Sequence, residues 1–170
     1  MILKIRIISD EVETFFMNIE IDESDTFLSL HNMIQKECNF KNEQISSFFI
    51  SNDDWEKGHE ITLLDMGDEN PSTSIMSDTS LQEHITSLND KLIYVFDQFN
   101  DRGLFITVID ICNEQADIDY PVCSHKTGNP PELTEEDIIS LLKDSEDLFD
   151  DISGDSSETD YLNSDTEDFY

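Results

Sequence analysis

Acidic residues are concentrated at the C-terminal end of this chain, and their distribution limits which part of it can fold. Residues 131–170 hold fifteen of the 40 acidic side chains and one of the nine basic ones. A segment with so little apolar area cannot offset the roughly 1–2 kcal/mol of backbone entropy that each residue loses on folding. We therefore expect residues 144–170 to be a disordered or loosely docked acidic tail, and residues 1–143 to form the folded domain.

The N-terminal part of the chain alternates between apolar and polar side chains, a pattern typical of strands with one buried face. Residues 2–8 and 14–22 both show this alternation, and a short polar turn separates them. Two such runs predict a β-hairpin. Apolar residues at helical spacing follow in residues 26–38, after Ser24 and Asp25, and either of these two side chains can cap a helix.

Later segments predict three more strands and the loops between them. Residues 47–50, 91–96 and 104–109 are runs of apolar, aromatic and β-branched side chains, as in strands. Residues 51–60 and 67–80 are polar or rich in turn-forming residues and predict surface loops. The remaining expectations are a short apolar segment at 61–66, one or two helical turns at 80–85, an irregular stretch at 113–131 and a C-terminal helix that begins near residue 134.

The order strand, strand, helix, strand and then a late strand pair is that of a β-grasp (ubiquitin-like) sheet. One main helix then covers one face of a mixed sheet, so the predicted fold class is α+β. We expect a single domain over residues 1–143 and the tail over residues 144–170. The predicted core comprises Phe15, Met17, Ile19, Phe27, Leu30, Ile34, Phe48, Ile50, Ile93, Val95, Ile106 and Val108.

The net charge excludes several classes of function. At −31, the chain repels nucleic-acid phosphates and anionic membrane surfaces, since binding either needs clustered Lys and Arg. No stretch approaches the roughly 18 consecutive apolar residues of a membrane span. Cys38, Cys112 and Cys123 are few and odd in number, as in reduced thiols of a cytoplasmic protein. We therefore expect a cytoplasmic protein. We also expect no cofactor, and the five glycines are scattered singly and form no phosphate-binding loop.

Three segments carry a family resemblance. They are the hairpin with residues 26–34, the stretch 91–101, which is similar to a Tyr-x-Tyr-Asp-Phe-Gly-Asp motif, and Cys123 with residues 128–132, which are similar to a Cys…Pro-Pro-Glu ending. Together they resemble the Ri-plasmid ORF-3-like family, also called transposon passenger TnpR-like. The chain departs from that pattern at Asn100, where the family has Gly, and lacks the Trp and His that usually follow. The resemblance implies a fold more than an activity, because the family has no well-defined biochemistry.

Candidate site residues lie mainly around the turn between the last two predicted strands. Asp97 and Asp101 could hold a divalent cation together with an acid of residues 53–56, but no spacing there matches a calcium loop. Aspartate is also common in turns because its side chain bonds to the backbone. Trp55, in a polar loop, either docks on the sheet or contacts a partner. The candidate interaction surface comprises Trp55, His59, Tyr94, Asp97, Asp101, Pro130, Pro131, Glu132, Phe149, Tyr161 and Phe169.

These observations favour a non-enzymatic protein-interaction module. Its tail sets apolar residues among acids, and such segments can bind basic, hydrophobic grooves, so the expected protein partner is of basic character. Two alternatives stay open: a metal-dependent or hydrolytic enzyme with its acidic site near Asp97 and Asp101, and an acidic DNA mimic that inhibits a DNA-binding protein. A strand-exchange recombinase is disfavoured, because it needs several arginines around the scissile phosphate and this chain has two.

Overall fold

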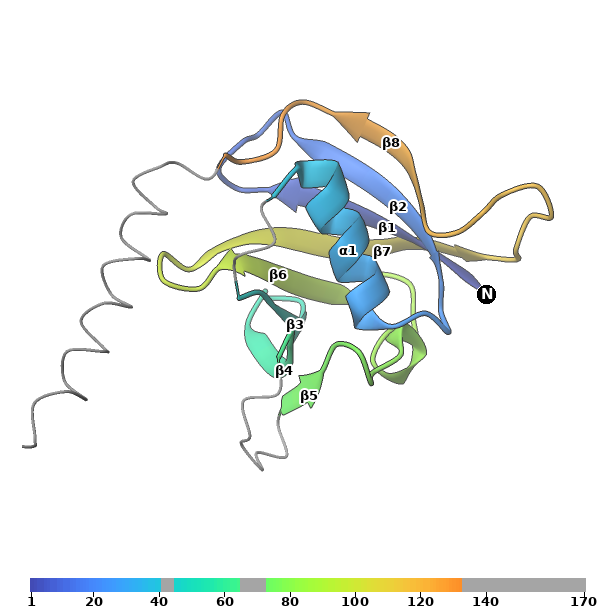
Figure 1. Cartoon of the computed structure of the whole chain (residues 1–170), viewed down its shortest axis with the longest axis horizontal. Coiled ribbons are helices and arrows are strands. Elements are labelled where there is room, and N and C mark those ends of the chain that lie inside the picture. The colour runs from blue at the N-terminus through green and yellow to red at the C-terminus, as the bar shows by residue number, and fades with distance from the viewer. Residues whose placement is uncertain (41–44, 65–72, 133–170) are drawn as a thin grey trace, which may run out of the picture. The chain divides into compact units, whose positions relative to one another are not determined.

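The computed structural model describes residues 1–40, 45–64 and 73–132, in which one helix packs against an eight-stranded sheet (Figure 1). The strands are β1 (Ile2–Ser9), β2 (Phe16–Asp22), β3 (Ser47–Ser51), β4 (Lys57–Thr62), β5 (Thr73–Ile75), β6 (Lys91–Asp97), β7 (Arg102–Cys112) and β8 (Val122–Thr127). The helix is α1 (Phe27–Cys38), and a short 3-10 helix, η1, spans Leu81–Glu83. The predicted α+β class is therefore confirmed for the described part of the chain.

The order of the strands in the sheet is β5-β4-β3-β6-β7-β1-β2-β8. β4 and β5 are parallel, and the other neighbouring strands are antiparallel, so the sheet is mixed as expected. β1 lies between β2 and β7, and Ile5 pairs with Ile19 on one side and Val108 on the other. The β-grasp description is not confirmed: the sheet has eight strands, and β1 is antiparallel to both of its neighbours.

Helix α1 covers one face of the sheet with an apolar stripe that includes Phe27, Leu30 and Ile34, all fully buried. The helix begins after Thr26, whose hydroxyl accepts a hydrogen bond from the Ser29 N–H at 3.2 Å. The expectation that Ser24 or Asp25 caps this helix is therefore wrong. Ser24 instead donates both its N–H and its hydroxyl to the carboxylate of Asp22, which closes the turn before the helix.

Three strands lie in segments that the sequence predicts to be loops or irregular. β4 occupies part of the expected loop 51–60, β5 part of the expected loop 67–80, and β8 part of the irregular stretch 113–131. These strands lie at or next to the edges of the sheet and bury few side chains, so their sequences lack apolar alternation. Backbone pairing with a neighbouring strand holds them in place.

The predicted core is largely confirmed. Eleven of the twelve expected residues are buried. Ile50, the penultimate residue of β3, is half-buried. The chain divides into two units, Met1–Glu132 and Leu133–Tyr170. The expected C-terminal helix and the tail at 144–170 lie outside the described residues. No helix of the described part is both long and apolar enough to span a membrane.

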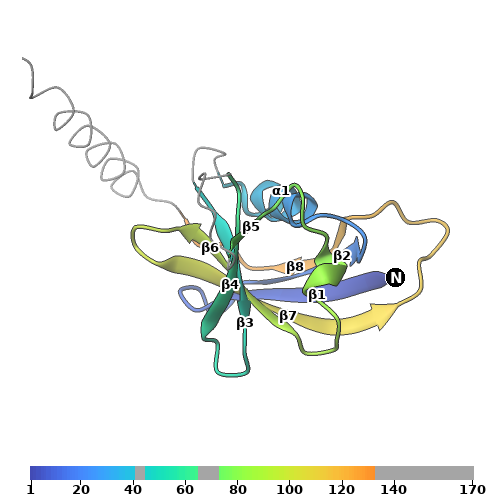
Figure 2. The same cartoon turned by 90° about the horizontal axis from the view of Figure 1, so that it is seen from below.

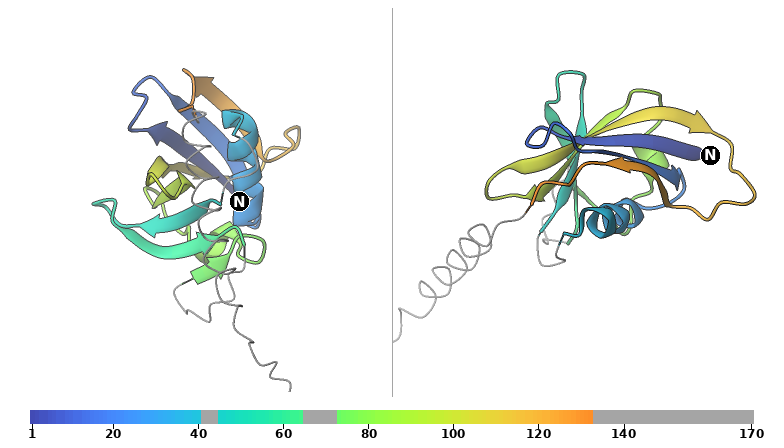
Figure 3. Two further views of the ribbon diagram at one scale, coloured as in Figure 1. Left: turned by 60° about the vertical axis from the view of Figure 1, so that its left-hand side comes forward. Right: turned by 90° about the horizontal axis from the view of Figure 1, so that it is seen from above.

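The second face of the sheet is not covered by the helix. Figure 2 and Figure 3 show α1 on one side of the sheet and the loop between β3 and β4 extending on the other. Side chains alternate between the two faces along each strand. Tyr94 of β6 bonds to residues of α1, so its neighbours Ile93 and Val95 point to the opposite, helix-free face.

Candidate functional site

An open groove with a volume of about 410 Å³ lies on the helix-free face of the sheet. Three parts of the chain form it: the turn after β1, the β3–β4 hairpin, and strands β6 and β7 with the turn that joins them. The residues that line it are Asp10, Glu11, Trp55, Lys57, Ile93, Val95, Asn100, Asp101, Arg102, Gly103 and Phe105. The groove thus contains two of the predicted interaction residues, Trp55 and Asp101.

Trp55 forms one wall of the groove. Its backbone is left-handed, with φ of 62°, which is uncommon for a bulky residue. The ring packs edge-to-face on Phe105, with centroids 5.0 Å apart, and the Lys91 ammonium lies 5.1 Å from the ring centroid. The Asn52 side chain orders the loop by accepting hydrogen bonds from two backbone N–H groups. Trp55 therefore docks on the sheet, yet its half-buried side chain still lines the groove.

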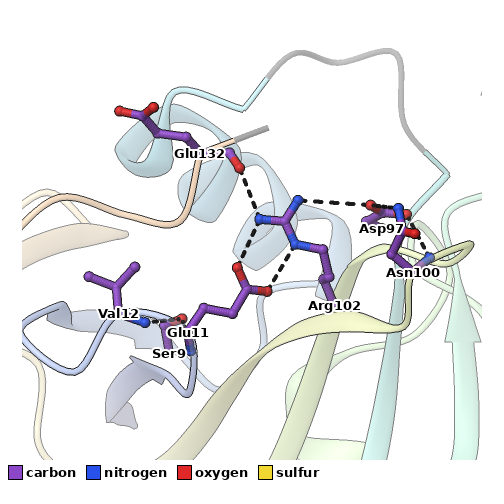
Figure 4. Close-up of polar contacts among 7 residues, drawn as sticks. All are labelled: Ser9, Glu11, Val12, Asp97, Asn100, Arg102 and Glu132. Carbon is purple, nitrogen blue, oxygen red and sulfur yellow. Dashed lines mark hydrogen bonds and ion pairs between the residues drawn. The ribbon is translucent and has the colours of Figure 1, made fainter. Parts of the chain in front are cut away.

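Arg102 links the turn after β1, the β6–β7 turn and the backbone at Glu132 (Figure 4). Its guanidinium donates two hydrogen bonds to the carboxylate of Glu11, at 2.9 and 2.8 Å, and one to the carbonyl oxygen of Glu132 at 2.9 Å. It also lies 5.2 Å from the centroid of the Phe96 ring. This bidentate geometry fits the rigid fork of arginine and not the point charge of lysine. This role of Arg102 was not predicted from the sequence, although the chain has only two arginines.

Asp97 shapes the turn between β6 and β7. Its buried carboxylate accepts hydrogen bonds from the backbone N–H groups of Phe99 and Asn100, at 3.1 and 3.2 Å, and from the Asn100 side chain at 2.9 Å. An Arg102 nitrogen lies 4.0 Å from the same carboxylate (Figure 4). Because Asp97 is buried and bonds to its own turn, its inclusion in an exposed interaction surface is wrong.

Asp101 lies at the exposed end of the same turn, with its backbone in the left-handed region. Its carboxylate pairs with the ammonium of Lys57, which also lies 5.1 Å from the centroid of the Phe49 ring. Asp97 and Asp101 therefore interact with different cations and do not share one. Within the described residues, no group of three or more His, Cys, Asp or Glu side chains is arranged to hold a metal ion.

Tyr94 belongs to the core and not to the surface, which corrects its place among the interaction residues. It is fully buried, and its hydroxyl accepts a hydrogen bond from the Gln35 side chain at 2.6 Å and bonds to the Nδ1 atom of His31 at 2.9 Å. Burial raises the pKa of Tyr94 to about 12. Burial also lowers the pKa of His31, because the charged imidazolium is poorly solvated there.

Of the other predicted surface residues, those that the structure describes do not line the groove. The Nε2 atom of His59 lies 2.8 Å from the Ser74 hydroxyl, and its ring stacks on His84 with centroids 4.8 Å apart. Burial first, and then the proximity of His59, lower the pKa of His84. Pro130 is half-buried, Pro131 is buried, and Glu132 is exposed. Phe149, Tyr161 and Phe169 lie outside the described residues.

The fold and the groove define an α+β protein with one covering helix and a binding-sized groove on the opposite face of its sheet. The chain belongs to the plasmid pRiA4b ORF-3-like protein family, whose model matches residues 1–154. The TnpR-like designation stays a prediction.

A similar fold occurs in the crystal structure of MM3350, a protein of unknown function from Methanosarcina mazei Go1. The two chains are 18% identical, with a TM-score of 0.66, and the alignment covers 95% of this chain and 93% of the other. At that identity, the likeness shows the fold alone. The comparison with curated proteins finds no match.

Proposed function

We propose that this protein is a non-enzymatic interaction module that engages a protein partner through the groove beside Trp55. The position of Trp55 carries the proposal. A large aromatic ring is held half-exposed by Phe105 and Lys91, on a backbone conformation that bulky residues rarely adopt. Tryptophan is enriched among the residues that dominate binding energy at protein interfaces. Backbone outliers of this kind also concentrate at functional sites.

The geometry gives less support to the enzymatic alternative. A metal-dependent or hydrolytic site near Asp97 and Asp101 needs carboxylates that converge on one ion or water molecule. Asp97 uses both of its carboxylate oxygens in the turn, and Asp101 pairs with Lys57. We therefore place the function in molecular recognition.

Site-specific photo-crosslinking tests the proposal. A benzophenone amino acid is introduced at position 54, next to Trp55, and separately at position 117, in the loop between β7 and β8. Asp54 and Asp117 are both exposed aspartates, so the two substitutions remove the same charge. In native lysate, we expect discrete adducts from position 54 that disappear in the Trp55→Ala background. Identical adducts from both positions, or adducts that persist without Trp55, would rule the proposal out.

The DNA-mimic alternative predicts a different result in the same experiment. A partner that recognises the acidic chain as a DNA substitute must release it when duplex DNA competes. Adducts that survive an excess of duplex DNA therefore support recognition through the groove. Adducts that DNA abolishes would support mimicry.

A further inference from the structure

We infer that the groove takes a basic segment of the partner, in which an arginine or lysine stands beside an apolar side chain. This inference rests on the proposed function and adds the chemistry of the partner.

The apolar lining calls for an apolar side chain in the ligand. The rings of Trp55 and Phe105 and the side chains of Ile93 and Val95 line the groove. Trp55 and Phe105 are both half-buried, so a ligand can still remove part of their surface from water. Removal of this apolar surface from water favours binding, before the cost of association is subtracted.

The cations of the groove are already matched by carboxylates. Arg102 is held in a bidentate pair by Glu11, and Lys57 is paired with Asp101. An acidic ligand would have to displace one of these carboxylates before it gained a charge partner. A negatively charged segment is therefore a poor match for the groove.

In contrast to these paired cations, Asp10 can accept a charged partner from a ligand. It is exposed, it lines the groove, and within the described residues its carboxylate has no hydrogen-bond or ion-pair partner. Asp101 is also accessible, since its side chain is 76% exposed. A cationic side chain entering the groove thus meets one free carboxylate and one exposed carboxylate, without breaking the Arg102–Glu11 pair.

The charge of the chain favours the same partner. A net charge of −31 attracts cations to the surface and raises their rate of encounter. It also opposes a second copy of the chain as the occupant, because two such molecules repel each other. The charge of the chain does not select the groove over other surfaces, so the test must separate local from overall attraction.

Peptide binding to the full-length protein provides this test. The probe is a fluorescent nonapeptide, Gly-Ser-Arg-Leu-Gly-Arg-Leu-Ser-Gly, and its control carries glutamate in place of both arginines. Binding is followed by anisotropy at about 0.15 M salt, which screens long-range attraction. Asp10→Asn is compared with Asp117→Asn, an exposed aspartate in the loop after β7, so each variant loses one unit of charge.

We expect Asp10→Asn to weaken binding of the arginine peptide about threefold to fivefold, the effect of losing one exposed ion pair. Trp55→Ala should weaken it at least about tenfold, as for an aromatic anchor. Asp117→Asn should leave the affinity unchanged. Because Asp10 is exposed, the Asn variant keeps the fold and the test remains decisive even if Trp55→Ala unfolds the loop.

Three results would overturn the inference. Equal losses in Asp10→Asn and Asp117→Asn would show that overall charge alone attracts the peptide. Tighter, Trp55-dependent binding of the glutamate peptide would show that the groove takes an acidic segment, and the proposed function would then still stand. If neither peptide binds but position 54 still gives Trp55-dependent adducts, the inference is overturned and the proposed function stands. If position 54 also gives no Trp55-dependent adducts, the proposed function is overturned too.

Discussion

Gly128 shows how one residue without a side chain permits the end of the domain to pack. Its φ is +72°, and a Cβ atom at this position would lie 2.5 Å from the carbonyl oxygen of Thr14. Gly128 follows β8 and precedes the Pro-Pro-Glu stretch that ends at Glu132. The glycine therefore lets the chain pass close to the β1–β2 turn on its way to the contact with Arg102.

We predict that Gly128→Ala lowers the free energy of unfolding by more than about 2 kcal/mol. The left-handed backbone alone costs a residue with a Cβ about 1–2 kcal/mol, and the clash with Thr14 adds to this. Urea unfolding of the full-length protein measures the change. The control is Thr127→Ala at the neighbouring exposed residue, which should change stability by less than about 0.5 kcal/mol. Equal effects of the two substitutions would contradict the prediction.

His31 makes stability depend on pH. Its ordinary pKa is 6.5, and burial lowers the pKa in the folded state. Between these two values the unfolded chain binds more protons than the folded one, so stability falls as the pH drops below about 6.5. The loss is complete below the folded pKa. The hydrogen bond to the hydroxyl of Tyr94 lies in the same buried network.

We predict that His31→Gln weakens the dependence of the unfolding free energy on pH between about pH 7.5 and 5.5, and that the lowered pKa of His84 maintains part of it. The substitution removes the proton that the unfolded state takes up, although it also lowers stability at pH 7.5 by breaking the bond to Tyr94. Urea titrations across this range give the slope. Asn32→Gln, at an exposed position of α1 that does not titrate, should keep the slope of the natural protein. An unchanged slope in His31→Gln would refute this account.

Single residues also show what the sequence could and could not predict about the site. The apolar and β-branched run at 91–96 correctly predicted that Ile93 and Val95 are buried, but a continuous run does not show which residues face the helix, and Tyr94 was misplaced on the surface. Trp55 was found because a tryptophan in a polar loop is conspicuous. Lys57, Phe105 and Glu11 were missed, because they come from separate strands and turns that only the sheet pairing brings together.

At the scale of elements, strands that bury one face were predictable and those near the edges were not. β1, β2, β6 and β7 each carry several buried apolar residues, which produce the alternating or apolar runs. β8 has no buried residue, and β4 has one, Ile61. A strand held mainly by backbone hydrogen bonds leaves no hydrophobic pattern to detect.

The start of α1 provides a test at this scale. We predict that Thr26→Ala destabilises the protein by about 1 kcal/mol, because the N–H of Ser29 loses its capping partner. Ser24→Ala should have a smaller effect, since its hydroxyl bonds to Asp22 in an exposed turn outside the helix. Thermal and urea unfolding of the two variants measure both changes. A larger loss in Ser24→Ala would mean that the helix begins earlier than Thr26.

At the scale of the whole molecule, the net charge leads to a prediction about nucleic acid. We predict no detectable binding to duplex DNA at about 0.15 M salt, because nine basic residues against 40 acidic ones leave too little positive charge to release the counterions of DNA. Fluorescence anisotropy with a labelled duplex measures it, and a basic DNA-binding protein serves as the positive control. Sub-micromolar affinity under these conditions would defeat the prediction.

The position of β1 between β2 and β7 has a consequence for the synthesis of the protein. β1 and β2 leave the ribosome before β7, so one side of β1 has no partner until β7 appears, starting at Arg102. About ninety residues separate the two strands, and at about 5–20 residues per second this interval lasts roughly 5–20 seconds. During that time the unpaired edge of β1, with Ile5 and Ile7 still exposed, is open to wrong pairing between nascent chains. We expect the nascent hairpin to be the point at which a chaperone protects this protein.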